Sequence, residues 1–546
     1  MKRLLIIILI LLMAVVTRFY LLGSLPGGLT WDEAAIAYNG FSIIETHRDE
    51  WLEKMPVSFR SFGDYKAPLA IYVSSIFTYL FGLNPWAIRL PFALSGVAAV
   101  LGIILLTEQI WVLSFEREKN KAFFSSQWAG LVAGGLLVLS PWHTLFSRVG
   151  FESGLALTEL IWGVYFLIVW KSNQNKKNLL VSSFYLVCAI LLLAATFYTY
   201  HSAKITVPLL LLGLFYFTHQ RGDRIFKAGV QFGLPFLVLL IPFINDSIFG
   251  EGLSRAGVTI VAEYGLSFRL LTALLSNILA HISPGFLVLG GTDSLRHSTG
   301  VWGVLLPTTF LYWLGGFVLV SKELCTKILS RGRQTRLTFA ANLALAWFIF
   351  GLLPAMIGME VPHPNRSLLA LPGFILLSVI GLDALLAWVN LFKPKFIKQV
   401  MAALVIFQLM FFGLFARTYL TSYQSASSNE FLSGYLEVSQ LAWQYLAGDD
   451  DRLPVSQVVM TSQYGQPYIF VLLAGQINPM AYHNGALVSF LFPDEVSVND
   501  LSRKNSLIIA KPGSFGLEAD RATKIIYDNY GHERFWLFVT DADLIE

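Results

Sequence analysis

Long apolar runs, separated by short polar segments, follow one another along most of the chain. A helix that crosses a bilayer needs about 20 mostly apolar residues. Eleven runs approach this length, and we expect each to be a transmembrane helix. They lie near residues 4–22, 87–112, 127–142, 153–170, 178–198, 203–218, 228–246, 301–321, 337–357, 367–391 and 399–418. The pattern predicts a polytopic α-helical membrane domain over residues 1–418.

The first apolar run follows Lys2 and Arg3, as the core of a secretory signal peptide would. It extends over residues 4–22, however, and it lacks a small-x-small cleavage site. We therefore expect it to remain as an uncleaved membrane anchor.

Lysine and arginine gather in alternate loops. If the N-terminus is cytoplasmic, the inner segments carry 19 Lys and Arg against four acidic residues. These segments are 1–3, 113–126, 171–177, 219–227, 322–336 and 392–398. Cytoplasmic loops are enriched in these cations. We expect a multi-pass protein of the plasma (inner) membrane with its N-terminus inside. The first loop 23–86, the segment 143–152, the Tyr200 region, the loops 247–300 and 358–366, and the tail 419–546 then lie outside.

The apolar stretch 68–83 admits more than one interpretation. As a further transmembrane helix it would reverse every later loop and move the Lys and Arg clusters outside. We prefer an amphipathic helix in the outer interface, because its aromatic residues suit the headgroup level. A re-entrant or short buried helix is the alternative. The loop 23–86 is thus expected to carry juxtamembrane helices.

The chain becomes more polar after residue 419, and short β-type runs appear. They are VSQVVMTS, SLIIAKPG and RFWLFVTDADLI, separated by helix-like segments such as 428–447 and QYGQPYIFVLLAG. Alternating strands and helices predict an extracytoplasmic α/β domain over 419–546, of about 128 residues. It contains no recognisable nucleophile or nucleotide-binding loop. We interpret it as an accessory domain that shapes the acceptor side or supports the loops; an independent binding module is the alternative.

The composition agrees with a membrane protein and excludes several other classes. Hydrophobic residues make up 55% of the 546 residues and charged residues 14%, and mean hydropathy is +0.61. The net charge of +4 offers no basic surface for nucleic acid. The two cysteines do not suggest a disulfide framework, because Cys188 lies in an apolar run and Cys325 in a basic loop.

Two adjacent carboxylates, Asp32 and Glu33, follow the first apolar run on the outer side. A carboxylate there can accept a proton from a hydroxyl as a general base. Acids at this position can also cap a helix start, and the two roles can coexist. A donor with an isoprenoid tail stays in the bilayer, so its phosphate would meet such groups at headgroup depth.

The outer segments also carry cations, although positive-inside topology leaves few there. Lys and Arg can hold a phosphate and stabilise the charge that develops as it leaves. Such cations can instead serve as interface anchors. They are Lys66, Arg148, Lys204, Arg255, Arg269, Arg296 and Arg366. Together with the acidic pair, they predict transfer of a group from a lipid phosphate.

Several stretches resemble one family. LPGGLTWDEAAIAYNG, GDYKAPLAIY and WAIRLPFALSGVAAVLGIILL are similar in order and spacing to the start of C-fold (GT-C) glycosyltransferases. The resemblance is to the protein O-mannosyltransferase and aminoarabinose transferase group. SRVGFESGLAL, FYTYHSAKITVPLLLL, SPGFLVLGGTDSLRHSTGVWGVLLP and PHPNRSLLALPGF resemble its bacterial branch, the dolichyl-phosphate-mannose-protein mannosyltransferase-like proteins.

The resemblance implies a GT-C glycosyltransferase of the cell envelope, acting in protein glycosylation or on a lipid or glycan. It would move a sugar from a polyprenyl-phosphate donor to a hydroxyl of an extracytoplasmic acceptor, by direct inverting displacement. Asp32 would be the base, with Glu33 its neighbour in the motif, and Lys66 would bind the donor phosphate.

The resemblance also implies roles for later residues. Glu152 stands where many relatives have Asp, and it would position an acceptor or a metal; a helix-start acid is an equal alternative. The remaining residues of this group would lie around the donor phosphate. They are Arg148, Lys204, Arg296 and Arg366, with His201, His297 and His363 as further candidates. The arginines rank above the histidines, because a permanently charged fork suits phosphate recognition.

No spacing matches a zinc motif, so a divalent metal is left open and no cofactor is required. A transporter or lipid-linked sugar flippase would also collect charges near a cavity. We find no internal repeat that would favour it. An oligosaccharyltransferase catalytic subunit shares the C-fold, but the chain lacks its Trp-Trp-Asp-Tyr-Gly stretch.

Overall fold

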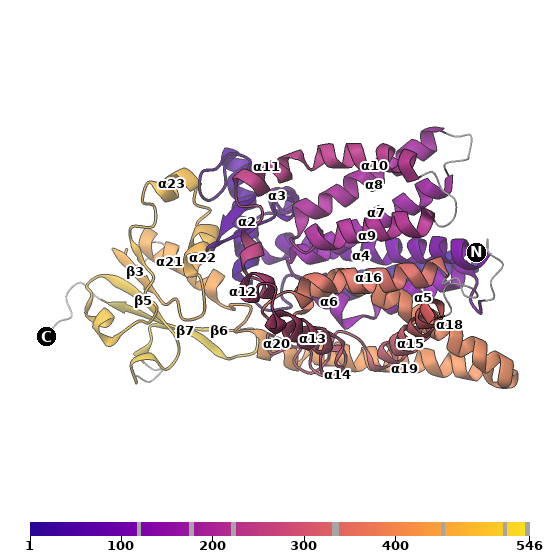
Figure 1. Cartoon of the computed structure of the whole chain (residues 1–546). Helices are drawn as coiled ribbons and strands as arrows, with labels where there is room; N and C mark the ends of the chain where they lie inside the picture. The colour runs from indigo at the N-terminus through magenta and orange to yellow at the C-terminus, as the bar shows by residue number, and fades with distance from the viewer. Residues whose placement is uncertain are drawn as a thin grey trace. The chain divides into compact units, whose positions relative to one another are not determined.

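The computed structural model describes residues 1–116, 122–173, 179–219, 225–329, 338–448, 454–516 and 521–540. The chain forms two compact units (Figure 1). The first consists of Met1–Tyr20, Val57–Leu69 and Phe92–Thr418, and the second of Leu21–Pro56, Ala70–Pro91 and Tyr419–Glu546. Two segments of the predicted first outer loop therefore fold with the tail. The division into domains 1–418 and 419–546 stays a prediction.

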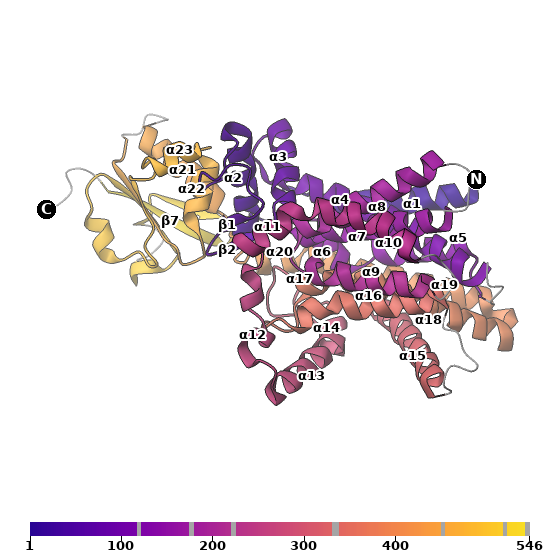
Figure 2. The same cartoon turned by 45° about the horizontal axis from the view of Figure 1, so that its top comes forward.

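The first unit is helical. Its long helices are α1 (Lys2–Phe19), α4 (Pro85–Trp111), α5 (Ser126–Val138), α7 (Glu152–Asn173), α8 (Leu179–Thr199), α9 (Ala203–His219), α10 (Ile225–Leu239), α15 (Pro307–Leu329), α16 (Phe339–Met356), α18 (Leu371–Phe392) and α19 (Ile397–Leu420). A helix lies in each of the eleven predicted ranges. α8, α9 and α16 lie side by side (Figure 2).

By length and composition, six helices in the described residues can cross a membrane, or seven if a bent pair is one span. The chain is thus a multi-pass membrane protein. Eleven spans stay a prediction, because α5 has only 13 residues and α9 only 17. The inner segments 113–126, 171–177, 219–227 and 322–336 each include residues outside the described ranges.

The predicted straight helix over 228–246 is broken. Gly229–Leu239 and Ile241–Phe249 (α11) meet at 52°. Pro242, in the first turn of α11, has no N–H to donate, and its ring displaces the preceding turn. The Tyr198 hydroxyl bridges the two helices at the break: it donates to Leu239 O at 2.7 Å and accepts from Phe243 N at 3.2 Å. The freed backbone groups are thus satisfied inside the protein.

Glycines allow the closest helix crossing of this unit. A methyl group on Gly316 of α15 would lie 1.9 Å from Leu377 O of α18, and one on Gly381 of α18 would lie 2.0 Å from Tyr312 O. Small residues of this kind let membrane helices pack backbone to backbone.

Shorter elements of the first unit carry its polar loops. They are β1 (Phe59–Ser61), β2 (Asp64–Lys66), the π-helical turn η1 (Val112–Glu116), α6 (Pro141–Phe146), η2 (Ser254–Gly257), α12 (Ile260–Tyr264), α13 (Phe268–Ile282), α14 (Pro284–Leu287), α17 (Pro364–Ser367), η3 (Leu368–Ala370) and η4 (Pro394–Phe396). β1 and β2 form an antiparallel hairpin in which Phe59 pairs with Lys66. This hairpin, which the sequence analysis did not predict, fixes the position of Lys66.

The second unit contains α2 (Trp31–Thr46) and α3 (Leu69–Phe81). They pack closely: a methyl group on Gly40 of α2 would lie 3.2 Å from Ser75 of α3. α3 has 13 residues, which is about 20 Å and shorter than a hydrocarbon core of about 30 Å. This length argues against a spanning helix at 68–83. Its exposed face carries Ile76, Tyr79 and Leu80, while its location in the interface stays a prediction.

The tail forms an α/β fold, as predicted. Its elements are α20 (Ser422–Ser427), α21 (Tyr435–Ala447), β3 (Gln457–Met460), α22 (Pro467–Ala474), α23 (Pro479–His483), β4 (Phe490–Leu491), η5 (Val498–Ser502), β5 (Ser506–Ala510), η6 (Ser514–Gly516), β6 (Lys524–Tyr527) and β7 (Glu533–Thr540). The sheet order is β4-β3-β5-β7-β6, with β3 parallel to β4 and β5. The three predicted strands and the helix after the first are confirmed, whereas β4 and β6 were missed.

The two faces of this sheet bury different residues. On one face, Trp536 and Phe538 pack with Val459, Ile508 and Leu501 of η5. On the other, Phe535 contacts Tyr435 of α21, which stacks on Phe470 of α22. The alternation along β7 follows from the two-residue period of a strand.

Candidate functional site

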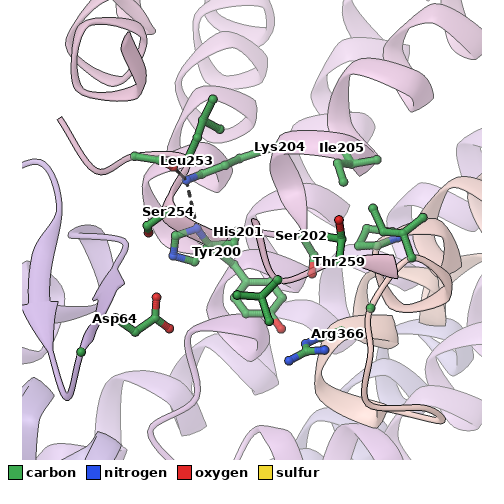
Figure 3. A pocket seen from close by; sticks show the side chains of 16 residues that line it. Asp64, Tyr200, His201, Ser202, Lys204, Ile205, Leu253, Ser254, Thr259 and Arg366 are labelled. Carbon is green, nitrogen blue, oxygen red and sulfur yellow. Dashed lines mark hydrogen bonds between the residues drawn. The ribbon is translucent and has the colours of Figure 1, made fainter. Parts of the chain in front are cut away.

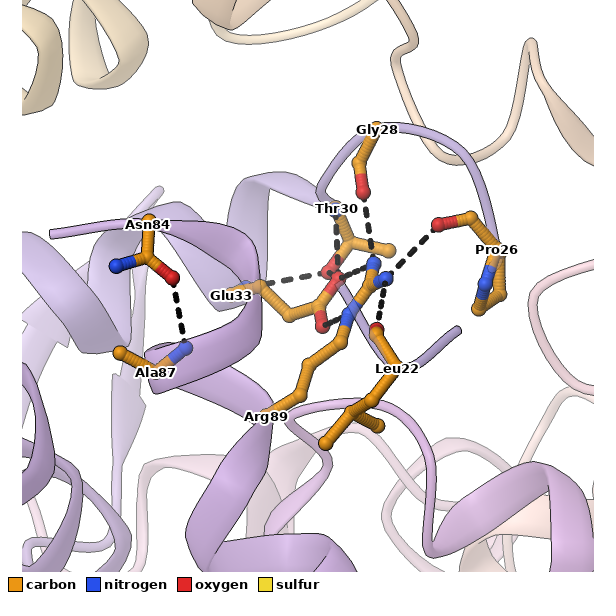
Figure 4. A network of polar contacts seen from close by, with 8 residues as sticks. All are labelled: Leu22, Pro26, Gly28, Thr30, Glu33, Asn84, Ala87 and Arg89. Atoms are coloured by element: carbon orange, nitrogen blue, oxygen red, sulfur yellow. Dashed lines mark hydrogen bonds and ion pairs between the residues drawn. The ribbon is translucent and has the colours of Figure 1, made fainter. Parts of the chain in front are cut away.

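Glu33 holds the segment around the acidic pair in place (Figure 4). Thr30 caps α2: its hydroxyl accepts from Glu33 N at 3.1 Å, and the Glu33 carboxylate accepts from Thr30 N at 3.0 Å. This capping box satisfies amides that a helix start leaves open. The Glu33 carboxylate is fully buried.

Arg89 of α4 is the partner of Glu33. Its guanidinium donates to both carboxylate oxygens, at 2.7 and 3.2 Å, and the side chain is fully buried. It also donates to the carbonyls of Leu22, Pro26 and Gly28. The Arg89 guanidinium therefore ties the segment 22–28, which leads into α2, to α4. Glu33 acts through this network and positions its neighbour.

Asp32 lies in the first turn of α2 and is only partly buried. The helix N-terminus stabilises its negative charge. Of the two adjacent acids, Asp32 is the one that stays partly exposed.

The tail supports α2 directly. The Tyr38 hydroxyl donates to Ile477 O at 2.9 Å, and the His483 imidazole contacts Glu50 O at 2.9 Å. A methyl group on Gly465 would lie 2.8 Å from the ring of Trp31, the residue before Asp32. This arrangement favours the predicted accessory role of the tail.

Lys66 and Glu152, distant in sequence, form an ion pair in the first unit. Lys66 Nζ lies 3.8 Å from Glu152 Oε1, and the side chains are 8% and 14% exposed. β2 ends at Lys66, and α7 begins at Glu152. Glu152 is a helix-start acid, as the alternative held, and it also holds the predicted phosphate ligand.

A cavity of about 640 Å³ brings further candidates together (Figure 3). Lys204 Nζ donates to His201 Nδ1 at 3.0 Å and to Gly252 O at 2.5 Å. His201 Nδ1 must then accept, which leaves Nε2–H to donate to Tyr65 O at 2.9 Å. His201 thereby links Lys204 to the residue before Lys66. Arg366 also lines this cavity.

Arg366, His363 and His297 form the next group. Arg366 donates to Glu360 at 3.1 Å. His363 Nδ1 accepts from Arg366 N and caps α17. Burial, together with His297 and Arg366, lowers the pKa of His363 to about 2, so this imidazole is neutral and its contact with Glu360 is no ion pair. The rings of His297 and His363 lie 4.9 Å apart.

Aromatic contacts connect this group to Glu152. His297 packs on Phe146 and on Phe151, the residue before Glu152. Arg296 is half-buried beside His297. Of these candidates, His201, Lys204 and Arg366 line the cavity. The Lys66–Glu152 pair and the His297–His363 pair are linked to them through neighbouring residues.

Two other outer cations lie apart from this lining. Arg148 is buried, and it donates to Thr17 O at 2.9 Å and Tyr20 O at 2.7 Å, the carbonyls at the end of α1. A helix C-terminus favours such a cation. Arg269 is exposed on α13, and the side chain of Arg255 lies outside the described residues.

Sequence reasoning missed several members of the site. Asp64, Tyr200, Ser202, Ser254 and Thr259 line the cavity. No local signal marks them, because folding alone brings them there. Arg89 stands in WAIRLPFALSGVAAVLGIILL, one of the stretches that carry the resemblance, and this stretch was a signal for it. Among the described residues, no group of three or more His, Cys, Asp or Glu is placed to hold a metal.

Comparisons with known proteins define the fold. No protein-family model and no curated protein matches the chain. ArnT from Cupriavidus metallidurans bound to undecaprenyl phosphate is similar in structure at 14% identity, with a TM-score of 0.52 over 99% of this chain and 98% of that one. Its apo state gives a TM-score of 0.53 at 14% identity, over 100% and 98%.

An archaeal protein shares the same architecture. The oligosaccharyltransferase AglB from Archaeoglobus fulgidus, in complex with an inhibitory peptide and a dolichol-phosphate, has a TM-score of 0.51 at 13% identity, over 100% of this chain and 75% of that one. The chain has the GT-C fold of these membrane enzymes, with a C-terminal α/β region.

Proposed function

We propose that this protein is a glycosyltransferase that moves a sugar from a polyprenyl-phosphate donor to a hydroxyl of an extracytoplasmic acceptor. The GT-C fold supports this proposal, since ArnT and AglB were solved with undecaprenyl phosphate and dolichol-phosphate. The observation that carries it is the cavity of the first unit, which Lys204 and Arg366 line, and to which His201 links the strand that ends at Lys66.

The cations of this lining suit a phosphate. Burying a charged side chain near the membrane is costly, and such side chains pair with a group of opposite charge. Lys66 Nζ lies 3.8 Å from the Glu152 carboxylate. A donor phosphate would bind Lys66 beside this pair, with Arg366 as a bidentate ligand.

Asp32 is the proposed base. It takes the proton of the acceptor hydroxyl as the oxygen attacks the anomeric carbon of the donor sugar. The bond between that carbon and the phosphate oxygen breaks, and its electron pair leaves with the lipid phosphate. Lys66, Lys204 and Arg366 stabilise this negative charge. The displacement is direct, so configuration inverts and no glycosyl-enzyme forms.

The finer assignments are also proposals. The tail and the acidic pair lie outside the cytoplasm, with the N-terminus inside. Mannose is the first sugar to test, followed by other hexoses and pentoses. The fold favours a transferase over the alternative transporter or flippase.

The test uses purified protein in nanodiscs with radiolabelled polyprenyl-phosphate sugars, mannose first. We expect Asp32→Asn to abolish release or transfer of label while donor binding persists, because the base alone is lost. Lys66→Ala should weaken donor binding. Lys504→Ala, a cation of the tail outside the site, is the matched control. Equal turnover in the wild type and Asp32→Asn would make the acid structural and the mechanism wrong.

A further inference from the structure

A second pocket lies within the tail, built by two loops that leave neighbouring parallel strands. It has a volume of about 470 Å³. Ser462, Gln463, Tyr464, Gly465, Gln466, Pro467 and Tyr468 follow β3, and Phe492 and Asp494 follow β4.

The topology of the sheet places this pocket where α/β proteins bind ligands. From β3 the chain enters α22, on the sheet face of Tyr435 and Phe535. From β4 it passes to η5, whose Leu501 packs with Trp536 and Phe538 on the opposite face. Two adjacent parallel strands whose connections leave to opposite faces open a crevice beyond their carboxyl ends, and ligands bind there.

The chemistry of the lining selects the ligand. No lysine, arginine or histidine lines the pocket, which argues against a phosphate. Gln463, Gln466 and Asp494 are exposed, and their side chains make no hydrogen bond to other described residues. An amide offers two donors and an acceptor, which matches hydroxyl groups that donate and accept.

The aromatic residues supply the apolar part of the pocket, and one of them is held rigidly. Arg534 and Lys511 lie over the ring of Tyr464 at 4.8 and 5.5 Å, and the Tyr464 hydroxyl donates to Arg534 O. Neither cation lines the pocket. Aromatic side chains combined with a few orienting polar groups are typical of small-ligand pockets, and Tyr468 and Phe492 are the other lining rings that the C–H groups of a sugar would contact.

We infer that this pocket binds a neutral saccharide and is the acceptor subsite of the proposed transferase. The saccharide-binding part stands on the pocket alone, whereas the acceptor role rests on the proposed function. The loop 462–468 supports that role, because Gly465 packs against Trp31, the residue before Asp32. The acceptor class is then a glycan.

The test measures binding of the full chain in nanodiscs to neutral di- to tetrasaccharides ending in mannose, glucose or galactose, without donor. A Ser/Thr-rich peptide and vesicles with undecaprenyl phosphate are the comparison probes. We expect one saccharide series to bind, and Gln463→Ala/Gln466→Ala to weaken it about tenfold or more. Gln444→Ala, an exposed amide on α21, is the matched control and should leave binding unchanged.

Three results would overturn the inference: no saccharide binds the wild type, the double variant binds as tightly as the wild type, or only the peptide or the vesicles depend on the two glutamines. Thermal unfolding of each variant verifies that it folds. Donor turnover separates the two proposals. Saccharide binding without turnover of any donor would contradict the proposed transferase function but support saccharide binding by the pocket. A double variant that transfers sugar normally would contradict only the acceptor role of the pocket.

Discussion

Replacing Arg89 with alanine tests the network that holds the acidic pair. The substitution leaves the Glu33 carboxylate fully buried without its guanidinium, and it removes the donor to the carbonyls of Leu22, Pro26 and Gly28. Removing one member of a buried ion pair costs about 3–5 kcal/mol, because the other charge stays behind.

The expected effect is local, so the assay is hydrogen–deuterium exchange of the α2 amides in nanodiscs. A loss of about 3–5 kcal/mol raises exchange through local opening by about a hundredfold to several thousandfold. The double variant Glu33→Leu/Arg89→Met should recover much of the protection, because no uncompensated charge remains.

Arg503→Ala provides the control for this prediction. Its ion pair with Asp500 spans 2.9 Å, but Arg503 is 41% exposed. Such surface pairs contribute about 0–1 kcal/mol. If Arg89→Ala changes the exchange of α2 no more than Arg503→Ala changes that of η5, the buried network does not hold the segment and our reasoning fails.

Two further predictions concern the helix crossing and the tail. Gly381→Ala should separate α15 from α18 and lower the thermal unfolding temperature of the protein in nanodiscs, because the new methyl group would lie 2.0 Å from Tyr312 O. Gly413→Ala, where a methyl group would meet open space, is the control. Equal effects of the two substitutions would refute the close approach of α15 and α18. Burial opposes ionisation of Asp528, but the amides of His532 and Tyr530 and the side chains of His532 and Ser428 lower its pKa overall. The ionised form therefore stabilises the tail above the unfolded pKa of about 3.9, and this stabilisation is lost as pH falls through the lower folded value. Asp528→Asn should flatten the acid dependence of exchange in β6 and β7, and an unchanged dependence would contradict this assignment.

Local patterns predicted the helices and the main strands well. The runs at 457–460, 506–510 and 533–540 form strands, and they are rich in the β-branched and aromatic residues that favour strands. β4 has only two residues and β6 four, with a register shift at Ile526. Two residues are too few for a pattern in β4, and the irregular register of β6 depends on its pairing with β7. The break at Leu240 was missed although Pro242 is a local signal for it; only its hydrogen-bond partner, Tyr198, is far away in the chain.

The candidate site was predictable in its residue types but not in its groupings. The resemblance pointed to Lys66, Glu152, His201, Lys204 and Arg366 one by one. Their contacts cross long stretches of chain, such as Lys66 with Glu152, and only the fold supplies them. Arg148, which was predicted for the donor, donates to the carbonyls at the end of α1, a contact that the sequence did not indicate.

The adjacent acids Asp32 and Glu33 illustrate why neighbouring residues of one type can differ in role. Successive positions of a helix point about 100° apart, so one acid can enter the protein while the next stays at its surface. Glu33 points inward, to Thr30 and Arg89, and is fully buried. Asp32 stays partly exposed on the same first turn. A base must be rigid and still reachable. The proposed base Asp32 would meet both demands, because Glu33 anchors the segment through its buried network while Asp32 stays partly exposed.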